Sequence, residues 1–251
     1  MAPTRPPGRI ETFNGQQIYL EVHGTREPLL LLHGFSGSSQ DWIPSFAQWG
    51  AKFQFILPDL RGHGRSGILS KPFRHDEAAM DMLALLDHLG ISACQGVGIS
   101  GGGNVLLHMA AKQPARLTAM VLVSATPYFP AQARSIMSQY PDGLAEQQWE
   151  ILRRRHPGGD AQIKAILAST KAFAISYDDM NFTPPLLSTI QASTLIIQGD
   201  RDPLYPVELS VEMTKAISHS RLWIIPNAGH GPVIGERWPE FLRTAAAFLQ
   251  E

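Results

Sequence analysis

Short apolar runs that alternate with longer amphipathic segments constrain the fold of this chain more than any other feature. The apolar runs predict strands at residues 29–32, 53–57, 97–99, 120–123, 195–197 and 222–225. Apolar residues at spacings of three and four predict helices over residues 76–89, 104–112, 207–217 and 239–249. Buried strands joined by crossover helices are typical of a parallel sheet that is covered on both faces. The sequence therefore predicts an α/β protein.

The first part of the chain predicts an antiparallel start to this sheet. Residues 10–13 and 17–22 flank Asn14-Gly15, a dipeptide that favours a two-residue hairpin turn. With this pair added to the six later strands, we expect a mostly parallel eight-stranded sheet with helices on both faces.

Residues 127–191 interrupt the alternation. They contain helical stretches separated by prolines and glycines, and no convincing strand. We predict a helical lid over 127–191, inserted after the sixth strand of a core made of residues 1–126 and 192–251. Among its larger side chains, some can line a substrate pocket and others can form the core of the lid itself. The candidates for substrate binding are Tyr128, Met137, Phe173 and Tyr177.

Composition narrows the classes of protein that this chain can belong to. A chain of 251 residues, 44% of them hydrophobic, can bury a core large enough to need no disulfide or metal. Its 21 basic and 22 acidic residues create no field that would attract nucleic acid or an anionic membrane. No run approaches the roughly 20 apolar residues of a membrane span, and no signal peptide is apparent, so we expect a cytoplasmic protein. Cys94 is interpreted as a small buried hydrophobe.

The segment Gly98-Ile99-Ser100-Gly101-Gly102 carries a candidate nucleophile. A serine at the apex of a strand-to-helix turn adopts a strained backbone conformation, and side chains at the flanking glycine positions would collide there. The bare pattern is a weak signal in a chain with 22 glycines. It gains weight because a predicted strand precedes it and a predicted helix follows it.

A serine hydroxyl needs a base within hydrogen-bond reach, and that base needs an acid to orient it. Because the carboxyl ends of parallel strands meet at one edge of the sheet, the loops that follow strands are the places to look. The loop after residues 195–197 holds Asp200 and Asp202, and the loop after residues 222–225 holds His230. The residues alone leave both aspartates open as the acid.

These motifs, together with His33-Gly34-Phe35-Ser36 after the third strand and the polar loop 59–66 after the fourth, resemble the α/β-hydrolase fold family, in its lid-bearing serine esterase-like group. The resemblance covers nearly all of the chain. It implies that Asp202 is the acid, since that residue stands third after the glycine that ends its strand.

The resemblance also implies roles for the remaining site residues. Ser100 would be the nucleophile, and His230 its base. The backbone N–H groups of Phe35 and Gly101 would form the oxyanion hole, and the Phe35 side chain would contact substrate. One departure is Gly101, where the family often carries a larger residue, which implies a looser turn and a roomier pocket.

Other polar residues of these loops are interpreted as structural. His33 would order its own loop, and Asp59 and Arg61 would hold theirs together. His63 is a rival, because its loop reaches the same edge of the sheet and its ring could touch substrate.

The implied activity is hydrolysis of small to medium carboxylic esters through an acyl-enzyme, with no cofactor and no metal. A serine at the apex of the strand-to-helix turn argues against haloalkane dehalogenases and epoxide hydrolases, whose nucleophile at that position is an aspartate. Lactonase, thioesterase, carbon-carbon bond hydrolase and perhydrolase activities stay open, as does a small-molecule receptor with residual hydrolysis. We expect neither nucleic acid nor a membrane as a partner. The natural substrate and the oligomeric state stay open.

Overall fold

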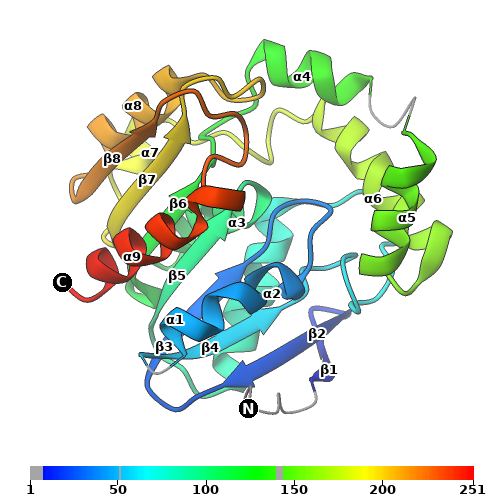
Figure 1. The fold of residues 1–251 in the computed structure, drawn as a ribbon, viewed down its shortest axis with the longest axis horizontal. Helices are drawn as coiled ribbons and strands as arrows, with labels where there is room; N and C mark the ends of the chain where they lie inside the picture. The colour runs from blue at the N-terminus through cyan, green and yellow to red at the C-terminus, as the bar shows by residue number, and fades with distance from the viewer. Residues whose placement is uncertain (1–7, 51, 140–143) are drawn as a thin grey trace.

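The protein is described by a computed structural model over residues 8–50, 52–139 and 144–251, and within these residues it forms one eight-stranded sheet (Figure 1). The strands are β1 (Arg9–Phe13), β2 (Gln16–His23), β3 (Glu27–Leu32), β4 (Phe53–Pro58), β5 (Cys94–Ile99), β6 (Leu117–Val123), β7 (Ser193–Gly199) and β8 (Ser220–Ile225). The α-helices are α1 (Phe46–Trp49), α2 (His75–His88), α3 (Gly101–Lys112), α4 (Ala131–Ser138), α5 (Glu146–Arg155), α6 (Gly159–Phe173), α7 (Pro184–Leu187), α8 (Val207–Ala216) and α9 (Trp238–Leu249). Short 3₁₀ helices are η1 (Ser39–Ser45), η2 (Pro114–Arg116) and η3 (Gly235–Arg237).

The strands lie in the order β1-β2-β4-β3-β5-β6-β7-β8. The β1–β2 and β2–β4 pairs are antiparallel, and every later pair is parallel. Asn14 and Gly15 both have positive φ, 48° and 76°, as the predicted tight hairpin requires. The mostly parallel sheet with an antiparallel start is therefore confirmed.

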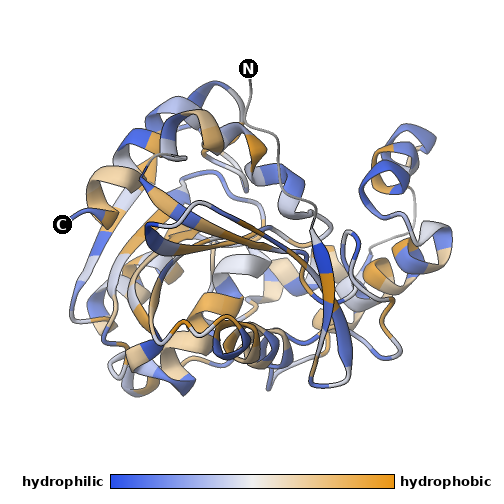
Figure 2. Ribbon diagram, turned by 90° about the horizontal axis from the view of Figure 1, so that it is seen from below, coloured by the Kyte–Doolittle hydropathy of each residue, from blue (hydrophilic) through white to orange (hydrophobic). Residues whose placement is uncertain are grey.

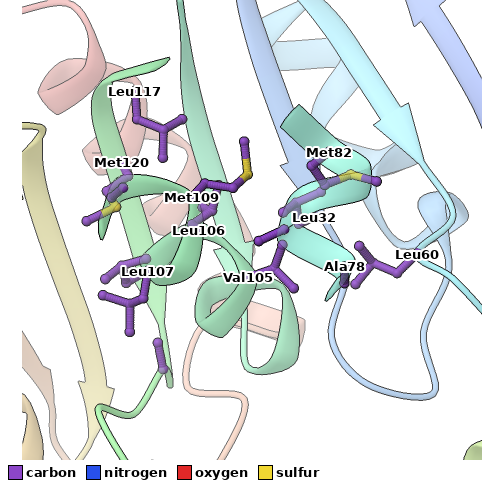
Figure 3. Close-up of a cluster of buried hydrophobic side chains, with 14 of the residues drawn as sticks. Leu32, Leu60, Ala78, Met82, Val105, Leu106, Leu107, Met109, Leu117 and Met120 are labelled. Atoms are coloured by element: carbon purple, nitrogen blue, oxygen red, sulfur yellow. The ribbon is translucent and has the colours of Figure 1, made fainter. Parts of the chain in front are cut away.

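Helices cover both faces of this sheet because its strands are apolar on both faces. Along β3, Leu30 and Leu32 pack in the cluster that includes α2, α3 and α8, whereas Leu29 and Leu31 pack in the cluster that includes α1 and α9. Figure 3 shows the first cluster, in which side chains of α2 and α3 meet Leu32. Figure 2 shows central strands in the orange of hydrophobic residues, and helices banded with both colours. Among the described residues, no helix combines the length and apolar character needed to cross a bilayer.

The chain between β6 and β7 forms a helical insertion, the name used here for α4, α5, α6 and α7 with their connections. This interval contains the range 127–191 for which a lid is predicted, and residues 140–143 of that range lie outside the described residues. An antiparallel bridge between Tyr128 and Asn181 brings its two ends together. In Figure 1, α4, α5 and α6 lie away from the sheet, at one end of its strands.

Polar contacts attach the helical insertion to two loops of the core. Nδ1 of His156 accepts a hydrogen bond from the amide of Gly64 (2.9 Å), which leaves its Nε2–H to donate to the carbonyl oxygen of Ser36 (3.2 Å). The side-chain amide of Gln162 donates to carbonyl oxygens of the loop after β4, including that of Gly62 (3.0 Å). Both side chains are buried, so these bonds fix the insertion against the sheet edge.

The burial of His156 predicts that the protein loses stability in mild acid. Burial lowers the pKa of this ring to about 4, from 6.5 in an exposed histidine. Between these values the unfolded chain binds a proton and the folded chain does not, so the free energy of unfolding falls as the pH falls. Each such histidine adds a slope of up to about 1.4 kcal/mol per pH unit. Urea unfolding at pH 7, 6, 5 and 4.5 measures it.

The matched variant for this measurement is His156→Gln. Glutamine offers one acceptor and one donor to the same core atoms, and it does not titrate. We expect its unfolding free energy to depend less steeply on pH below 6.5. A slope equal to that of the unmodified protein would contradict the assignment.

Candidate active site

Ser100 lies at the sharp turn between β5 and α3, with φ 50° and ψ −116°. The two glycines of the motif permit this turn. A Cβ on Gly98 would lie 2.5 Å from the backbone of Gly102, and a Cβ on Gly102 would lie 2.4 Å from the carbonyl oxygen of Leu32. Both distances are far below van der Waals contact. The turn therefore exists because these positions lack side chains.

Three side chains from distant parts of the chain form a continuous hydrogen-bonded row. Nε2 of His230 lies 2.8 Å from Oγ of Ser100, and Nδ1 of His230 lies 2.7 Å from Oδ2 of Asp202. Because an ionised carboxylate only accepts, Nδ1 carries the proton and Nε2 presents its lone pair to the serine hydroxyl. This is the arrangement in which a histidine can take a proton from serine.

Asp202 is held in place by the backbone around it. Its Oδ1 accepts from the amides of Leu204 (2.8 Å) and Tyr205 (3.1 Å), and its Oδ2 also accepts from the side-chain amide of Gln198 (2.8 Å). Burial acts to raise the pKa of this carboxyl, but the bonds from His230 and the two amides hold that pKa below its usual range. Asp202 is thus a fixed anion beside the imidazole.

Asp200, the other aspartate that the sequence leaves open, has a different position. Its side chain is exposed, and its Oδ1 accepts from the amide of Ala228 (3.2 Å). It therefore supports the loop that carries His230, and it does not contact the imidazole itself.

Two backbone amides next to Ser100 are available to a ligand. Gly101 is the first residue of α3, where an N–H has no partner within the helix. A Cβ built on Gly101 would lie 3.4 Å from the amide nitrogen of Phe35, so the two residues adjoin. Among the described residues, no hydrogen-bond acceptor is recorded for the amide of Phe35. The pair is suited to bind a negatively charged oxygen.

Two cavities meet at Ser100 and His230. The smaller, of about 270 Å³, lies between these residues and the helical insertion and is mostly apolar. Its further lining residues are Phe35, Ser36, His75, Gly101, Asn104, Phe129, Ile136, Met137, Thr170, Phe173, Leu204 and Tyr205. The larger, of about 640 Å³, extends past η1 toward the start of α9. Its further lining residues are Gly34, Phe35, Gly37, Gln40, Asp41, Pro44, Ile99, Arg155, Ile234, Gly235 and Trp238.

The residues that the sequence suggests for substrate binding do not all lie in these cavities. Phe35, Met137 and Phe173 line the smaller one. Tyr128 directs its hydroxyl to Glu212 (3.4 Å), and Tyr177 is 69% exposed with the guanidinium of Arg134 over its ring. Neither tyrosine lines a cavity at Ser100, so their positions do not support the assignment made from sequence. Each is at the outer side of the insertion, which its aromatic character alone does not reveal.

Comparison with known proteins identifies the family of this chain. A model of the alpha/beta hydrolase family matches residues 29–244, which is most of the chain. The chain belongs to the alpha/beta hydrolase family. The match includes the serine turn and both loops that supply Asp202 and His230.

Relatives of this alpha/beta hydrolase have several names. It is 27% identical over 259 residues to a non-heme haloperoxidase of Rhodococcus erythropolis, covering 88% of this chain and 92% of that protein. It is 26% identical over 263 residues to a bifunctional esterase/perhydrolase of Acinetobacter calcoaceticus, covering 89% and 93%. Among solved structures, an alpha/beta hydrolase from a Medee basin deep-sea metagenome library superposes with a TM-score of 0.83 at 22% identity, over 97% of this chain and 98% of that one.

The loops around the site of this alpha/beta hydrolase are held by buried polar residues. His33 bonds the carbonyl oxygen of Gly34 (2.8 Å) through Nδ1 and accepts the amide of Leu60 (2.9 Å) at Nε2. Asp59 accepts the amides of Ser39 and Arg65, at 2.7 and 2.8 Å.

Arg61 and His63 are equally enclosed. Arg61 forms a two-pronged pair with Asp81, at 2.7 and 2.9 Å. His63 is fully buried, with its Nδ1 2.9 Å from the carbonyl oxygen of Arg61, and it lines neither cavity. These positions match the structural interpretation of the loop residues.

A second histidine-aspartate pair, absent from the sequence-based predictions, lies at the wall of the smaller cavity. His75 opens α2, and its Nδ1 lies 2.7 Å from Oδ2 of Asp179 in the helical insertion. The amides of His75 and Asp76 also donate to Asp179, at 3.0 and 3.1 Å. No sequence signal links these residues, because they stand 104 positions apart and neither is part of a motif.

Proposed function

We propose that this alpha/beta hydrolase is a serine hydrolase that cleaves small to medium carboxylic esters through an acyl-enzyme. The observation that carries the proposal is the row from Asp202 through His230 to Ser100, with 2.7 and 2.8 Å between neighbouring polar atoms. The esterase/perhydrolase named above supports the same reaction class, as a relative over most of the chain.

The proposed reaction has two displacements. In the first, His230 takes the proton of Ser100 while Oγ forms a bond to the ester carbonyl carbon. The amides of Phe35 and Gly101 then stabilise the charge on the carbonyl oxygen, and Asp202 stabilises the imidazolium. As the tetrahedral intermediate collapses, the bond to the alcohol oxygen breaks and His230 donates the proton to that oxygen. In the second displacement, water repeats these steps against the acyl-enzyme and releases the acid.

The size and polarity of the two cavities support small to medium esters. We assign the acyl part to the smaller, apolar cavity and the alcohol part to the larger one. The larger cavity runs along the loop that follows His230, and in the proposed reaction the imidazole of His230 must reach the leaving oxygen. The Arg155–Asp41 ion pair (3.1 Å) also lines this cavity. A charged wall suits an alcohol leaving group that is released into water.

We further propose that the helical insertion acts as the lid of this site. Met137 of α4 and Phe173 of α6 contribute to the wall of the smaller cavity, opposite the sheet edge that carries Ser100. A lid in this position keeps water from an apolar acyl group and leaves the alcohol side open.

The test of the proposal is pre-steady-state hydrolysis of p-nitrophenyl acetate and p-nitrophenyl butyrate. We expect a burst of one equivalent of p-nitrophenol per chain or less, followed by repeated turnover, and an acyl group on the peptide that contains Ser100. A single slow equivalent without turnover would instead indicate a receptor. Repeated turnover with no acyl group on Ser100 in quenched samples would contradict the acyl-enzyme.

The same assay can separate the related activities. Lactones and thioesters matched to the butyryl ester in acyl length are measured beside it. We expect the oxygen ester to give the highest kcat/KM, and a higher value for either of the others would replace carboxylesterase by that activity.

A further inference from the structure

The imidazole of His75 presents a free nitrogen to the cavity that contains Ser100. His75 lines this cavity although its side chain is only 2% exposed, and Nδ1 is already bonded to Asp179. Burial acts to raise the pKa of Asp179, but the bonds from His75 and from backbone amides hold it well below its usual range. An ionised Asp179 fixes the proton on Nδ1. In the neutral imidazole, a proton on Nδ1 leaves Nε2 as an acceptor at the wall of the cavity, and in the described part of the chain Nε2 has no hydrogen-bond partner.

Nε2 also lies beside the two amides that flank the nucleophile. A Cβ on Gly101 would lie 3.7 Å from Nε2 of His75 and 3.4 Å from the amide nitrogen of Phe35. The imidazole and the oxyanion site thus lie on two sides of the space that a side chain at position 101 would occupy. Because residue 101 is glycine, a group attached near a bound carbonyl can reach Nε2.

A purely structural role accounts for Nδ1 of His75 but not for Nε2. The bond from Nδ1 to Asp179 ties the helical insertion to the start of α2, and Arg74 adds an ion pair to Asp178 (3.0 Å). An asparagine could make the same tie without Nε2. The hydroxyl of Thr170, which lines the same cavity, is buried without a partner. The cavity is apolar in area but holds two unpaired polar groups.

We propose that His75 is a specificity-determining residue whose Nε2 accepts a hydrogen bond from a hydroxyl group on the acyl part of the substrate, near the scissile carbonyl. The proposal rests on the esterase function proposed above and on the acyl part occupying the smaller cavity. The substrate class is then esters of short hydroxy acids. Asp179 is the positioning residue that directs the imidazole.

The experiment compares kcat/KM for methyl 3-hydroxybutyrate and methyl 2-hydroxybutyrate with that for methyl butyrate. We expect the unmodified protein to favour at least one hydroxy ester. In His75→Asn, which keeps a donor to Asp179 and removes Nε2, we expect the ratio of hydroxy to plain ester to fall about tenfold, as expected for one buried hydrogen bond. The ratio of the two kcat/KM values, and not the value for methyl butyrate alone, is the readout, because His75 also lines the cavity. His75→Phe keeps an aromatic side chain but removes both ring nitrogens, and it should lower the same ratio.

His108→Leu is the matched control. His108 lies 4.0 Å from Asp179 and its Nε2 is also buried without a partner, but it does not line the cavity. We expect this variant to keep the ratio of the unmodified protein. An unchanged ratio in folded His75→Asn and His75→Phe would overturn the proposal and leave His75 a structural tie. Absence of hydrolysis of all three esters by the unmodified protein would instead contradict the esterase function.

Discussion

Replacing Ser100 with alanine is expected to lower kcat for p-nitrophenyl butyrate by about 10⁴- to 10⁶-fold, as loss of the nucleophile does in other triads. The hydroxyl that forms the acyl bond would be gone, whereas the turn would remain, because alanine tolerates φ 50° about as poorly as serine does. Initial rates of p-nitrophenol release, corrected for the rate without protein, measure the loss.

Ser124→Ala is the matched control for this variant. Ser124 occupies the corresponding place after the next strand, β6, also with φ 50°, and it is buried away from both cavities. We expect its activity to stay within a few-fold of that of the unmodified protein. If Ser100→Ala retained activity comparable to that of Ser124→Ala, Ser100 would not be the nucleophile.

Replacing Asp202 with asparagine is expected to lower kcat by about 10⁴-fold. The side-chain oxygen of asparagine would still accept the amides of Leu204 and Tyr205, so its NH₂ group would face His230. Nδ1 of His230 would then have to accept, and the proton would move to Nε2. In that tautomer the imidazole cannot take a proton from Ser100.

Asp200→Asn is the control, because it makes the same chemical change two residues away. Its oxygen can still accept the amide of Ala228, so we expect activity close to that of the unmodified protein. Asp202→Asn also brings its NH₂ group next to the side-chain amide of Gln198, so urea unfolding is measured for both variants to separate a loss of kcat from a loss of stability. A larger loss of kcat in Asp200→Asn than in Asp202→Asn would exchange the roles of the two aspartates.

Patterns of neighbouring residues were sufficient to predict the sheet. A run such as Leu29–Leu32 is buried on both sides, and Asn14-Gly15 selects one kind of turn; each is a local property that the fold preserves. The turn at Ser100 was predictable for the same reason, since it requires glycine at the two positions that flank it, Gly98 and Gly102. The acid was predicted by resemblance and not by spacing, because Asp200 and Asp202 both follow the same strand.

The walls of the site were less predictable. Tyr128 and Tyr177 are aromatic residues in the right interval, but their orientation depends on how α4 and α6 pack, and that packing involves contacts far apart in sequence. His75 and Asp179 meet only because the insertion folds back onto the start of α2. Neither residue type is unusual at its position, so the pair becomes visible only in three dimensions.

Under the proposed function, the junction of two unequal cavities at one serine makes the preferences for the two halves of an ester separable. Met137 and Phe173 line the 270 Å³ cavity and not the other, and Trp238 and Ile234 line the 640 Å³ cavity and not the other. Libraries can therefore be built on one wall at a time, and gains should combine nearly additively where the substituted residues do not contact each other or the shared residue Phe35. Such a scaffold is well suited to stepwise redesign for new acid and alcohol combinations.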